Sequence, residues 1–390
     1  MPKERQRRQI SDTSISNSMK RVKRDPVSYY LSTGSTLLDL AVSDRYPGGV
    51  GGGRVTHLYG DNSTAKTLLL QEILGACQRM GGTAVLADAE WAFDYPRAEL
   101  FGLKVGRWEE EEYQRDQIDG ETKAFEAETE KSGCKERLKY YTKQLGACSG
   151  FLSRHPRTVE ELFDVEIAGL IQAVDDGLLK PPIVLGVDSL SALSSNVERA
   201  ADLDKGTYGM SRAKAYSAGF RKYLGDMATH GVTMVAIDQT RENVGISFGD
   251  KKTTSGGKAM GFYATTRILL TSGGYIEKTE GIKTGVQIKF LVKKNKLAAP
   301  FRNGIIRIVF DLGVDDVASN LEWLKECKID GKLDCNGSWW SWDGKSLGQG
   351  LDKSTLKIES EDLMEALEQE VTRVWRKVYA PSVGRKKRHG

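Results

Sequence analysis

The chain has 390 residues, and its 57 lysines and arginines nearly balance its 53 aspartates and glutamates, which leaves a net charge of +4. This length can bury one substantial core and a smaller domain. Because no run of about eighteen apolar residues occurs, we expect a globular protein without a membrane-spanning helix. The first residues also lack the apolar stretch of a secretory signal.

The five cysteines are widely spaced along the chain: Cys77, Cys134, Cys148, Cys327 and Cys335. None belongs to a CxxC motif or a Cys/His cluster, so the sequence does not favour a structural zinc site. We therefore expect reduced thiols and a cytoplasmic location.

Both ends of the chain are basic, although the whole chain is nearly neutral. Residues 1–28 are polar, Ser-rich and without hydrophobic periodicity, which predicts a flexible basic arm. Arg385-Lys386-Lys387-Arg388 forms a second basic segment near the other end. Such segments are often only solvated, but they also suit a polyanionic partner.

The stretch from Gly60 to Thr67 is typical of a phosphate-binding loop. Apolar Val55–Tyr59 predicts a strand before it, and Leu68–Leu74 predicts a helix after it. In that context the backbone N–H groups and the helix N-terminus point at phosphates. The residues expected to bind the nucleotide are Gly60, Asp61, Asn62, Ser63, Thr64, Ala65, Lys66, Thr67 and Leu68.

Two side chains of this loop have specific predicted roles. Lys66 places a positive charge at the β- and γ-phosphates, and the Thr67 hydroxyl can bind Mg²⁺. Ala65 occupies the position before the lysine, where Gly is usual and where a Cβ meets a tightly wrapped backbone.

Strands and helices alternate through most of the chain, which predicts an α/β fold with a mostly parallel sheet and helices on both faces. The predicted elements after the loop are a strand at Thr83–Asp88, a helix at Val159–Val174, a strand at Ile183–Asp188, a helix at about 210–229 and a strand at Val232–Ile237. Between them, residues 106–152 are highly charged, and we predict a solvated insertion there.

Three polar side chains follow the predicted strands. Asp188 ends a wholly apolar strand, where a carboxylate can hold the Mg²⁺ shell. Glu90 follows another strand and can act as a general base on water. Gln239 follows a third and can respond to the γ-phosphate. The alternatives are that Asp188 ends its strand by chance and that Glu90 is simply solvated.

The segment 240–261 is rich in Gly, Ser, Thr and Lys, and we predict a long loop. Its basic side chains are Arg241, Lys251, Lys252 and Lys258. They suit contact with a nucleic-acid backbone, although a mobile surface hairpin is an open alternative. Three β-rich runs follow at Thr265–Leu270, Gly285–Val292 and Ile305–Phe310. Beyond about residue 315 we expect a small α+β unit with a helix over Glu361–Val378.

Several of these segments together resemble the bacterial RecA recombinase family. The matching segments, in order, are Ser32–Ser35, Asp88–Asp94, Val187–Leu193, Phe248-Gly249, Thr253–Ala259, Lys293–Phe301, Gly337–Ser341 and Gly348–Gly350. They span about three quarters of the chain. The resemblance implies a RecA-type P-loop ATPase core at residues 29–315 and a C-terminal α+β domain at residues 316–380. A basic tail at residues 381–390 would follow.

The resemblance also implies roles at the ATP site. Glu90 matches the catalytic glutamate, and Gln239 matches the glutamine that couples the γ-phosphate to DNA. Lys294 and Lys296 match lysines that reach the ATP of a neighbouring subunit, as arginine fingers do. Asp94 and Phe310 match positions near the adenine, which we expect on opposite sides of the subunit interface.

Two DNA segments follow from the same resemblance, the first at about Glu198–Gly209 and the second at about Thr240–Ser255. The residues expected at DNA are Tyr208, Gly209, Lys214, Ser217, Arg221, Arg241, Val244, Gly256, Gly257 and Lys258. Of these, Tyr208 or Gly209, and Val244, fall where apolar side chains wedge between nucleotide triplets.

The chain also departs from the family pattern. Besides Ala65, Asp61 replaces a usual Pro, and the adenine-stacking tyrosine near Pro96 and Arg97 is missing, with Tyr95 as a candidate substitute. The insertion is foreign to bacterial members, and a basic tail replaces an acidic one. These departures favour a phage-encoded or otherwise divergent member.

The function implied is a DNA-dependent ATPase that uses ATP and Mg²⁺. It would form helical filaments of its own chain on single-stranded DNA and exchange strands with a homologous duplex. Two alternatives remain at this point. One is an ATP-switched DNA-binding filament protein with little hydrolysis, and the other is a ring-type helicase with the same core.

Overall fold

The computed structural model describes residues 27–105, 150–201, 209–242, 252–254, 257–279 and 281–380. Both basic end segments lie almost wholly outside these residues, as do most of the charged insertion and parts of both predicted DNA segments. Within the described part of the chain, no helix is both long and apolar enough to cross a membrane.

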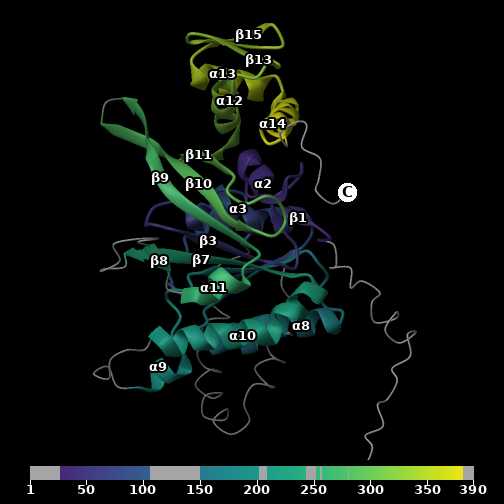
Figure 1. Ribbon diagram of the computed structural model, residues 1–390, viewed down its shortest axis with the longest axis vertical. Helices are drawn as coiled ribbons and strands as arrows, with labels where there is room; N and C mark the ends of the chain where they lie inside the picture. Colours follow the sequence, from purple (N-terminus) through teal and green to yellow (C-terminus); the bar gives the residue numbers. More distant parts are fainter. Residues whose placement is uncertain are drawn as a thin grey trace, which may run out of the picture.

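The largest sheet forms the centre of the molecule, with helices on both of its faces (Figure 1). Its parallel strands are β3 (Val55–Gly60), β4 (Thr83–Asp88), β5 (Phe151–Arg154), β6 (Ile183–Asp188), β7 (Val232–Glu242) and β9 (Thr266–Thr279). They lie in the order β9-β3-β7-β6-β4-β5. Antiparallel strands extend the sheet beyond β9, namely β10 (Ile282–Asn295), β11 (Asn303–Val309) and β12 (Gly313–Asp315). This arrangement confirms the predicted α/β class with a mostly parallel sheet.

The central strands are apolar along their whole length because both of their faces are covered. Leu58, Leu86 and Val184 pack on one face, in a core that also contains residues of the helix after β3. Val85 and Val187 point to the other face and pack in a second core. Parallel strands buried on both sides cannot alternate with polar residues, which is why their sequences predicted them well.

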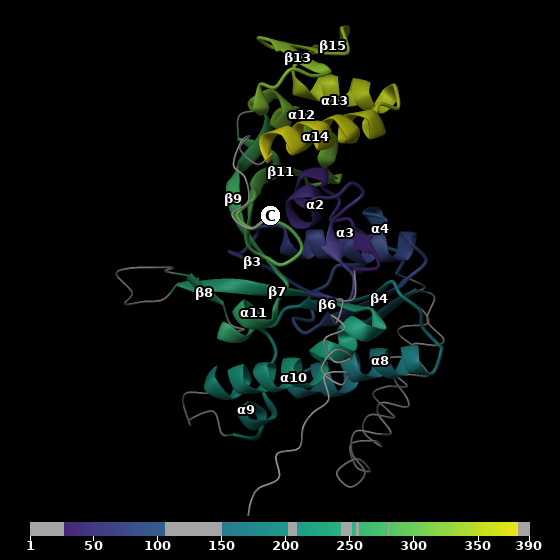
Figure 2. The same ribbon diagram turned by 45° about the vertical axis from the view of Figure 1, so that its right-hand side comes forward.

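Different helices cover the two faces (Figure 2). On one face lie α2 (Thr36–Ser43), α3 (Lys66–Arg79) and α4 (Tyr95–Leu100). On the other lie α7 (Val159–Glu161), the π-helical segment η1 (Leu162–Ile167), α8 (Ala168–Asp175), α10 (Gly209–His230) and α11 (Gly257–Tyr263), with α9 (Asn196–Ala200) beside α10. The helix predicted over Val159–Val174 is therefore present, with a π-helical stretch inside it.

A smaller unit follows the sheet and is drawn in yellow at the top of Figure 1. It contains α12 (Asp316–Cys327), α13 (Leu351–Ser360), α14 (Met364–Val378) and the antiparallel strands β13 (Leu333–Asn336), β14 (Trp339–Trp342) and β15 (Lys345–Gln349). Trp340, Trp342 and Trp375 are buried in it. The predicted start of the last helix at Glu361 is wrong, because a turn with left-handed Asp362 (φ 55°) separates α13 from α14.

The prediction of one loop over residues 240–261 is also wrong in its described parts. Strand β7 continues to Glu242, because Thr240–Glu242 pairs antiparallel with β8 (Lys252–Thr254). Residues 257–263 form α11, whose Ala259 and Met260 are buried in the core beneath the sheet. Among the described strands, β8 pairs only with β7, and its sequence shows no alternation of apolar and polar residues. The sequence pattern therefore did not predict it.

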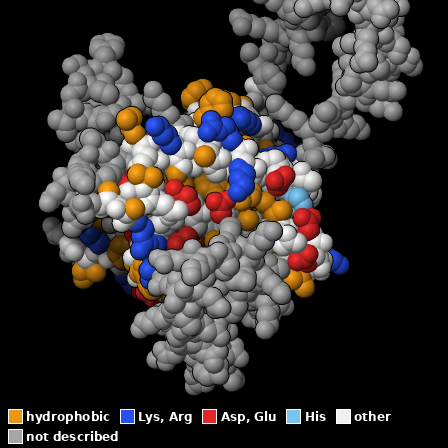
Figure 3. All heavy atoms as spheres, turned by 90° about the horizontal axis from the view of Figure 1, so that it is seen from below, with side chains coloured by type: hydrophobic (Ala, Val, Ile, Leu, Met, Phe, Trp, Pro, Cys, Tyr) orange, Lys and Arg blue, Asp and Glu red, His pale blue; other side chains and the backbone are white. Residues whose placement is uncertain are grey.

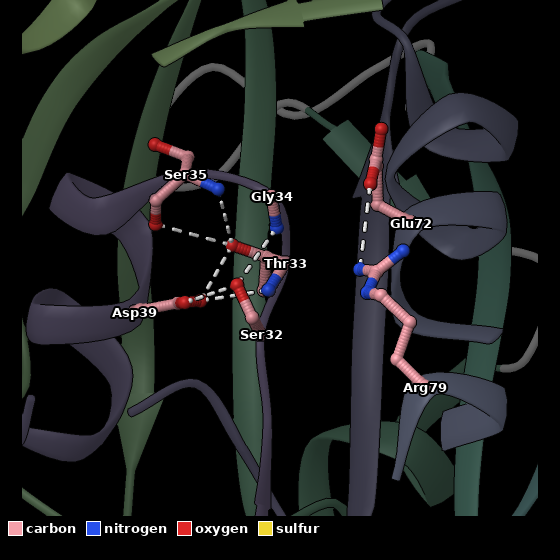
Figure 4. A network of polar contacts seen from close by, with 7 residues as sticks. All are labelled: Ser32, Thr33, Gly34, Ser35, Asp39, Glu72 and Arg79. Carbon is pink, nitrogen blue, oxygen red and sulfur yellow. Dashed lines mark hydrogen bonds and ion pairs between the residues drawn. The ribbon is translucent and has the colours of Figure 1, made fainter. Parts of the chain in front are cut away.

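A short two-stranded sheet, β1 (Tyr30–Leu31) with β2 (Val50–Gly51), leads into α2. The connecting segment is held by Asp39, which accepts hydrogen bonds from the Ser32 hydroxyl at 2.6 Å, the Thr33 N–H at 2.8 Å and the Thr33 hydroxyl at 2.7 Å (Figure 4). Gly34 has φ 78° and lies against α3, where a Cβ would come within 3.0 Å of Glu72. The Ser-Thr-Gly-Ser motif therefore joins α2 to α3.

Asp39 is almost fully buried, and this burial raises the pKa of its carboxyl group to about 6. A raised pKa in the folded state stabilises the protein below the pKa of the unfolded chain, near 4, and that stabilisation is lost as pH rises through about 6. Asp39→Asn can keep the same contacts, because its amide can donate to Ser32. We expect the unfolding free energy of the variant to fall less between pH 4.5 and pH 7 than that of the wild type, as measured by urea denaturation.

The matched control is Asp343→Asn, which removes the same charge at an exposed position. The comparison with it separates the effect of burial at Asp39 from the effect of removing one carboxylate. If Asp39→Asn and the wild type lost stability equally over this range, the raised pKa of Asp39 would be refuted.

Candidate nucleotide-binding site

The loop between β3 and α3 wraps closely around the space at the end of the strand. A Cβ on Gly60 would lie 2.1 Å from the carbonyl oxygen of Leu270 on β9, so only glycine fits there. Ser63 and Ala65 both adopt the left-handed conformation, with φ 57° and 58°. Ala65 therefore takes up the backbone geometry that glycine usually supplies, at a cost of about 1–2 kcal/mol.

Lys66 starts α3 and turns back into this loop. Its Nζ donates to the carbonyl oxygens of Asp61 at 2.6 Å and Gly60 at 3.3 Å, and it lies 3.4 Å from the Thr64 hydroxyl. Only 8% of the residue is exposed, and this burial lowers the pKa of its amine. Carboxylates nearby oppose that shift, so the site holds one buried cation among several acids.

Thr67 and Asp188 meet where α3 starts and β6 ends. The Thr67 hydroxyl donates to Oδ2 of Asp188 at 2.7 Å. The pKa of Asp188 is raised to about 6, mainly by burial, with the charge of Glu90 contributing in the same direction. A hydroxyl and a carboxylate are oxygen ligands that Mg²⁺ accepts. No group of three His, Cys, Asp or Glu in the described ranges could hold a metal alone, so this pair fits an ion whose other ligands are phosphates and water.

Glu90 and Gln239 lie beside this pair, as the direction of their strands predicts. Gln239 Nε2 donates to Oε1 of Glu90 at 3.4 Å, and the buried Ser189 hydroxyl donates to the same oxygen. Together with the loop, these side chains surround a cavity of ≈ 340 Å³. Its lining residues are Asn62, Ser63, Thr64, Ala65, Lys66, Thr67, Leu68, Glu90, Asp188, Ile237 and Gln239.

One contact at this site was not predicted from the sequence. The Thr240 hydroxyl donates to Oδ1 of Asp61, which ties the phosphate loop to the end of β7. The available signal was Asp61 itself, because a proline at that position could not accept the hydrogen bond. Asp61, which departs from the family pattern, therefore forms a hydrogen bond that the usual residue could not form.

A model of the RecA N-terminal domain matches residues 7–118 and 141–315. The chain belongs to the RecA family.

Protein RecA of Thermus thermophilus is 30% identical over 343 residues, which cover 87% of this chain and 84% of that protein. Protein RecA of Thioalkalivibrio sulfidiphilus is 28% identical over 342 residues, with 87% and 83% covered. Protein RecA of Chlamydia abortus is 29% identical over 346 residues, with 88% and 82% covered. These relatives give no support to a phage origin. The unmatched residues between the two RecA segments fall inside the predicted charged insertion.

The two lysines carried over from the RecA pattern lie away from the cavity of their own chain. Lys294 Nζ donates to the carbonyl oxygens of Gly261 and Phe262 at 2.8 Å each, at the end of α11. Partial burial, with repulsion from Lys296 and Arg267, lowers the pKa of Lys294 to about 8. Lys296 is exposed. Neither is among the residues that line the cavity.

The structure brings Asp94 and Phe310 near each other within one chain, and their expected places on opposite sides of a subunit interface stay a prediction. Asp94 caps α4, and Arg97 in that helix donates from Nη2 to the carbonyl oxygen of Phe310 at 3.2 Å. Both residues therefore lie in the same region of one chain. The suggestion that Tyr95 replaces a stacking tyrosine is wrong, because Tyr95 is buried and its hydroxyl lies 2.6 Å from that of Ser153.

The described part of α10 carries three residues predicted to lie at DNA. Lys214, Ser217 and Arg221 are spaced by three and four residues, which places them along one side of the helix. Lys214 and Arg221 are exposed, while the Ser217 hydroxyl donates to the carbonyl oxygen of Ala213 at 2.9 Å. Figure 3 shows the molecule from below, with basic, acidic and hydrophobic side chains mixed among the described atoms.

The remaining predicted DNA residues are described only in part. The backbone of Arg241 belongs to β7, Gly209 begins α10, and Gly257 with Lys258 begins α11. Tyr208, Val244 and Gly256 lie outside the described residues. The first predicted DNA segment also includes part of α9, so its start is helical.

The left-handed conformation of Ala65 yields a test of the loop. Ala65→Gly should raise the free energy of unfolding by about 1 kcal/mol, because glycine adopts this conformation without the Cβ penalty. Ala76→Gly is the matched control inside α3, in its last turn. It should lower the free energy of unfolding by about 1 kcal/mol, because glycine is unfavourable inside a helix. Urea denaturation measures both, and an equal loss in the two variants would contradict the conformation assigned to Ala65.

Proposed function

We propose that this protein is a DNA-dependent ATPase that forms helical filaments on single-stranded DNA and pairs that strand with a homologous duplex. The observation that carries the proposal is the shared cavity lined by Lys66, Thr67, Glu90, Asp188 and Gln239. Membership of the RecA family supports the proposed action on DNA. The structure describes only some of the residues that are predicted to bind DNA. The substrate is ATP, and the activity is recombination and DNA repair.

In this proposal the residues from Gly60 to Leu68 bind the phosphates of ATP. The hydrogen bonds of Lys66 to neutral loop carbonyls are exchanged for bonds to phosphate oxygens, which are stronger because both partners are charged. Thr67 and Asp188 would hold Mg²⁺, which supplies positive charge against the phosphates when it is bound. Asp94 and Phe310 lie toward the base.

Hydrolysis is assigned to Glu90 and Gln239. Glu90 is exposed to the cavity and can accept a proton from the attacking water. Gln239 donates to Glu90 here, and its amide can turn to the γ-phosphate when ATP is bound. Since Gln239 lies on β7, which continues toward the second DNA segment, nucleotide state and DNA contact are coupled through this strand.

The DNA contacts are assigned to α10, to the start of α11 and to the two DNA segments. Lys214, Ser217 and Arg221 would face the phosphate backbone, as would Arg241, Gly256, Gly257 and Lys258. Tyr208 or Gly209, and Val244, would wedge between nucleotide triplets. Base pairing then supplies sequence recognition, so affinity should fall with salt and vary little with sequence. Duplex DNA binds the same filament during exchange.

The self-association follows from Lys294 and Lys296. A cation that lies away from its own nucleotide cavity can serve the cavity of a neighbouring copy, and such head-to-tail contacts build open helical filaments. ATP between subunits would stabilise the filament, and hydrolysis would release it.

The first test compares Lys66→Ala, Glu90→Gln and the wild type. Lys66→Ala should lose ATP binding and ATP-dependent filaments, because no other buried cation lines the described cavity. Glu90→Gln should keep filaments and lose turnover by about 100-fold or more, as expected for the loss of a general base. ATP hydrolysis with and without single-stranded DNA, together with electron microscopy, measures both effects.

The alternatives give different outcomes in the same experiment. Unchanged turnover in Glu90→Gln would indicate a filament protein that uses ATP mainly as a switch. Closed rings on DNA would indicate a helicase. Wild-type filaments from Lys66→Ala would contradict the assignment of the loop.

The second test mixes Lys294→Ala with Glu90→Gln. One variant has an intact cavity without its neighbour's lysine, and the other supplies Lys294 but cannot hydrolyse. In a 1:1 random filament, about one quarter of the interfaces combine an intact cavity with an intact lysine, so about a quarter of the wild-type turnover should return. If Lys294 acted within its own chain, the mixture would show only the average of the two separate variants.

A further inference from the structure

The segment that follows β6 contains a chain of hydroxyl groups that the proposed function does not use. Ser189 is fully buried, and its hydroxyl donates to Oε1 of Glu90. The Ser191 hydroxyl lies 2.7 Å from that of Ser189. Because Ser189 gives its only hydroxyl proton to the carboxylate, Ser191 must be the donor in this second hydrogen bond. The order of donation is therefore Ser191 to Ser189 to Glu90.

Two side chains of α10 donate hydrogen bonds to the backbone of the same segment. Arg212 Nη1 donates to the carbonyl oxygens of Ser191 at 3.3 Å and Leu193 at 3.4 Å. One turn later, the hydroxyl of the fully buried Tyr216 donates to the carbonyl oxygen of Leu190 at 2.7 Å. Two side chains of one helix thus bind three carbonyl oxygens of the turn that carries Ser191.

The surroundings of Arg212 indicate that its side chain is held in place by the carbonyl oxygens of this turn. Its Nε is buried and has no hydrogen-bond partner among the described residues. Drawing a guanidinium group away from water is costly, so its position depends on the two carbonyl oxygens that it does reach. A surface arginine without a role would keep its whole head group in water.

We propose that Ser191 is a positioning residue for ATP hydrolysis, acting through Ser189 on Glu90 and held in place by Arg212 of α10. This inference rests on the proposed function. Glu90 is exposed and can adopt other rotamers, so a donor fixed on its Oε1 keeps the carboxylate directed at the cavity. Since α10 starts next to the first predicted DNA segment, any movement of this helix when DNA binds would change the hold on Glu90. The catalytic carboxylate would thereby be linked to DNA through a second element, independently of Gln239.

The first arm of the test uses Ser191→Ala and Ser191→Thr. Ser191→Ala should lower kcat of DNA-stimulated ATP hydrolysis about tenfold, because an unsupported Ser189 holds the carboxylate less often in the reactive position. KM for ATP and the binding of a non-hydrolysable ATP analogue, followed by fluorescence of the exposed Trp91, should stay at wild-type values. Ser191→Thr keeps the hydroxyl and should restore kcat.

The second arm uses Arg212→Met, which keeps the length of the side chain but removes its donors. The stimulation of turnover by single-stranded DNA should fall at least threefold, while the affinity for DNA and its dependence on salt stay as in the wild type. Weaker DNA binding would instead make Arg212 a DNA contact and overturn its assigned role. Unchanged stimulation would overturn the link to α10.

The possible results for Ser191→Ala can also be distinguished from one another. Wild-type kcat in Ser191→Ala overturns the inference and leaves the proposed function standing. Parallel changes in kcat, KM and thermal unfolding without rescue by threonine would indicate a merely structural residue, which also overturns it. A wild type that does not hydrolyse ATP would overturn the proposed function, and this inference with it.

Discussion

The whole candidate site depends on the parallel pairing of β3, β7, β6 and β4. Gly60 pairs in register with Gln239, and Asp88 pairs with Asp188. Because the four strands run in one direction, their ends meet at one edge of the sheet, where ligands bind in folds of this type. Residues that are far apart in the sequence thus reach the same cavity without any long loop to bring them there.

The electrostatics of this edge follow from that convergence. Asp188, Glu90 and Asp61 surround one buried cation, Lys66, whose hydrogen bonds go to neutral carbonyl oxygens. Desolvation, together with repulsion from Glu90 and Asp88, raises the pKa of Asp188 to about 6. The acids therefore favour a ligand that arrives with its own cation, while Lys66 and the loop N–H groups favour phosphate. A metal–triphosphate complex satisfies both demands.

This architecture could be predicted from the sequence because the patterns that indicate it are local. Fully apolar strands such as Ile183–Asp188 and the Gly60–Thr67 loop follow from patterns a few residues long, and the structure has both. The turn at Asp362, the pairing of Thr240–Glu242 with β8, and the closeness of Arg97 to Phe310 depend on contacts between distant segments. A single sequence does not encode such contacts in any local pattern. For the same reason the hydrogen bond from Thr240 to Asp61 could not be predicted, although the unusual Asp61 marked the place.

Two elements donate hydrogen bonds to Glu90, namely β7 and the turn after β6. In β7, Thr240 directly after Gln239 donates a hydrogen bond to Asp61, which connects the phosphate loop to this strand. After β6, Ser191 and Arg212 connect Glu90 to α10. A carboxylate held only by Gln239 would respond to β7 alone. Held by two donors on Oε1, from β7 and from the turn after β6, Glu90 is placed correctly only when both elements are in position. Under the proposed function, such a requirement would make hydrolysis conditional on two elements that carry predicted DNA residues, as a filament would need for ATP turnover to follow its engagement with DNA.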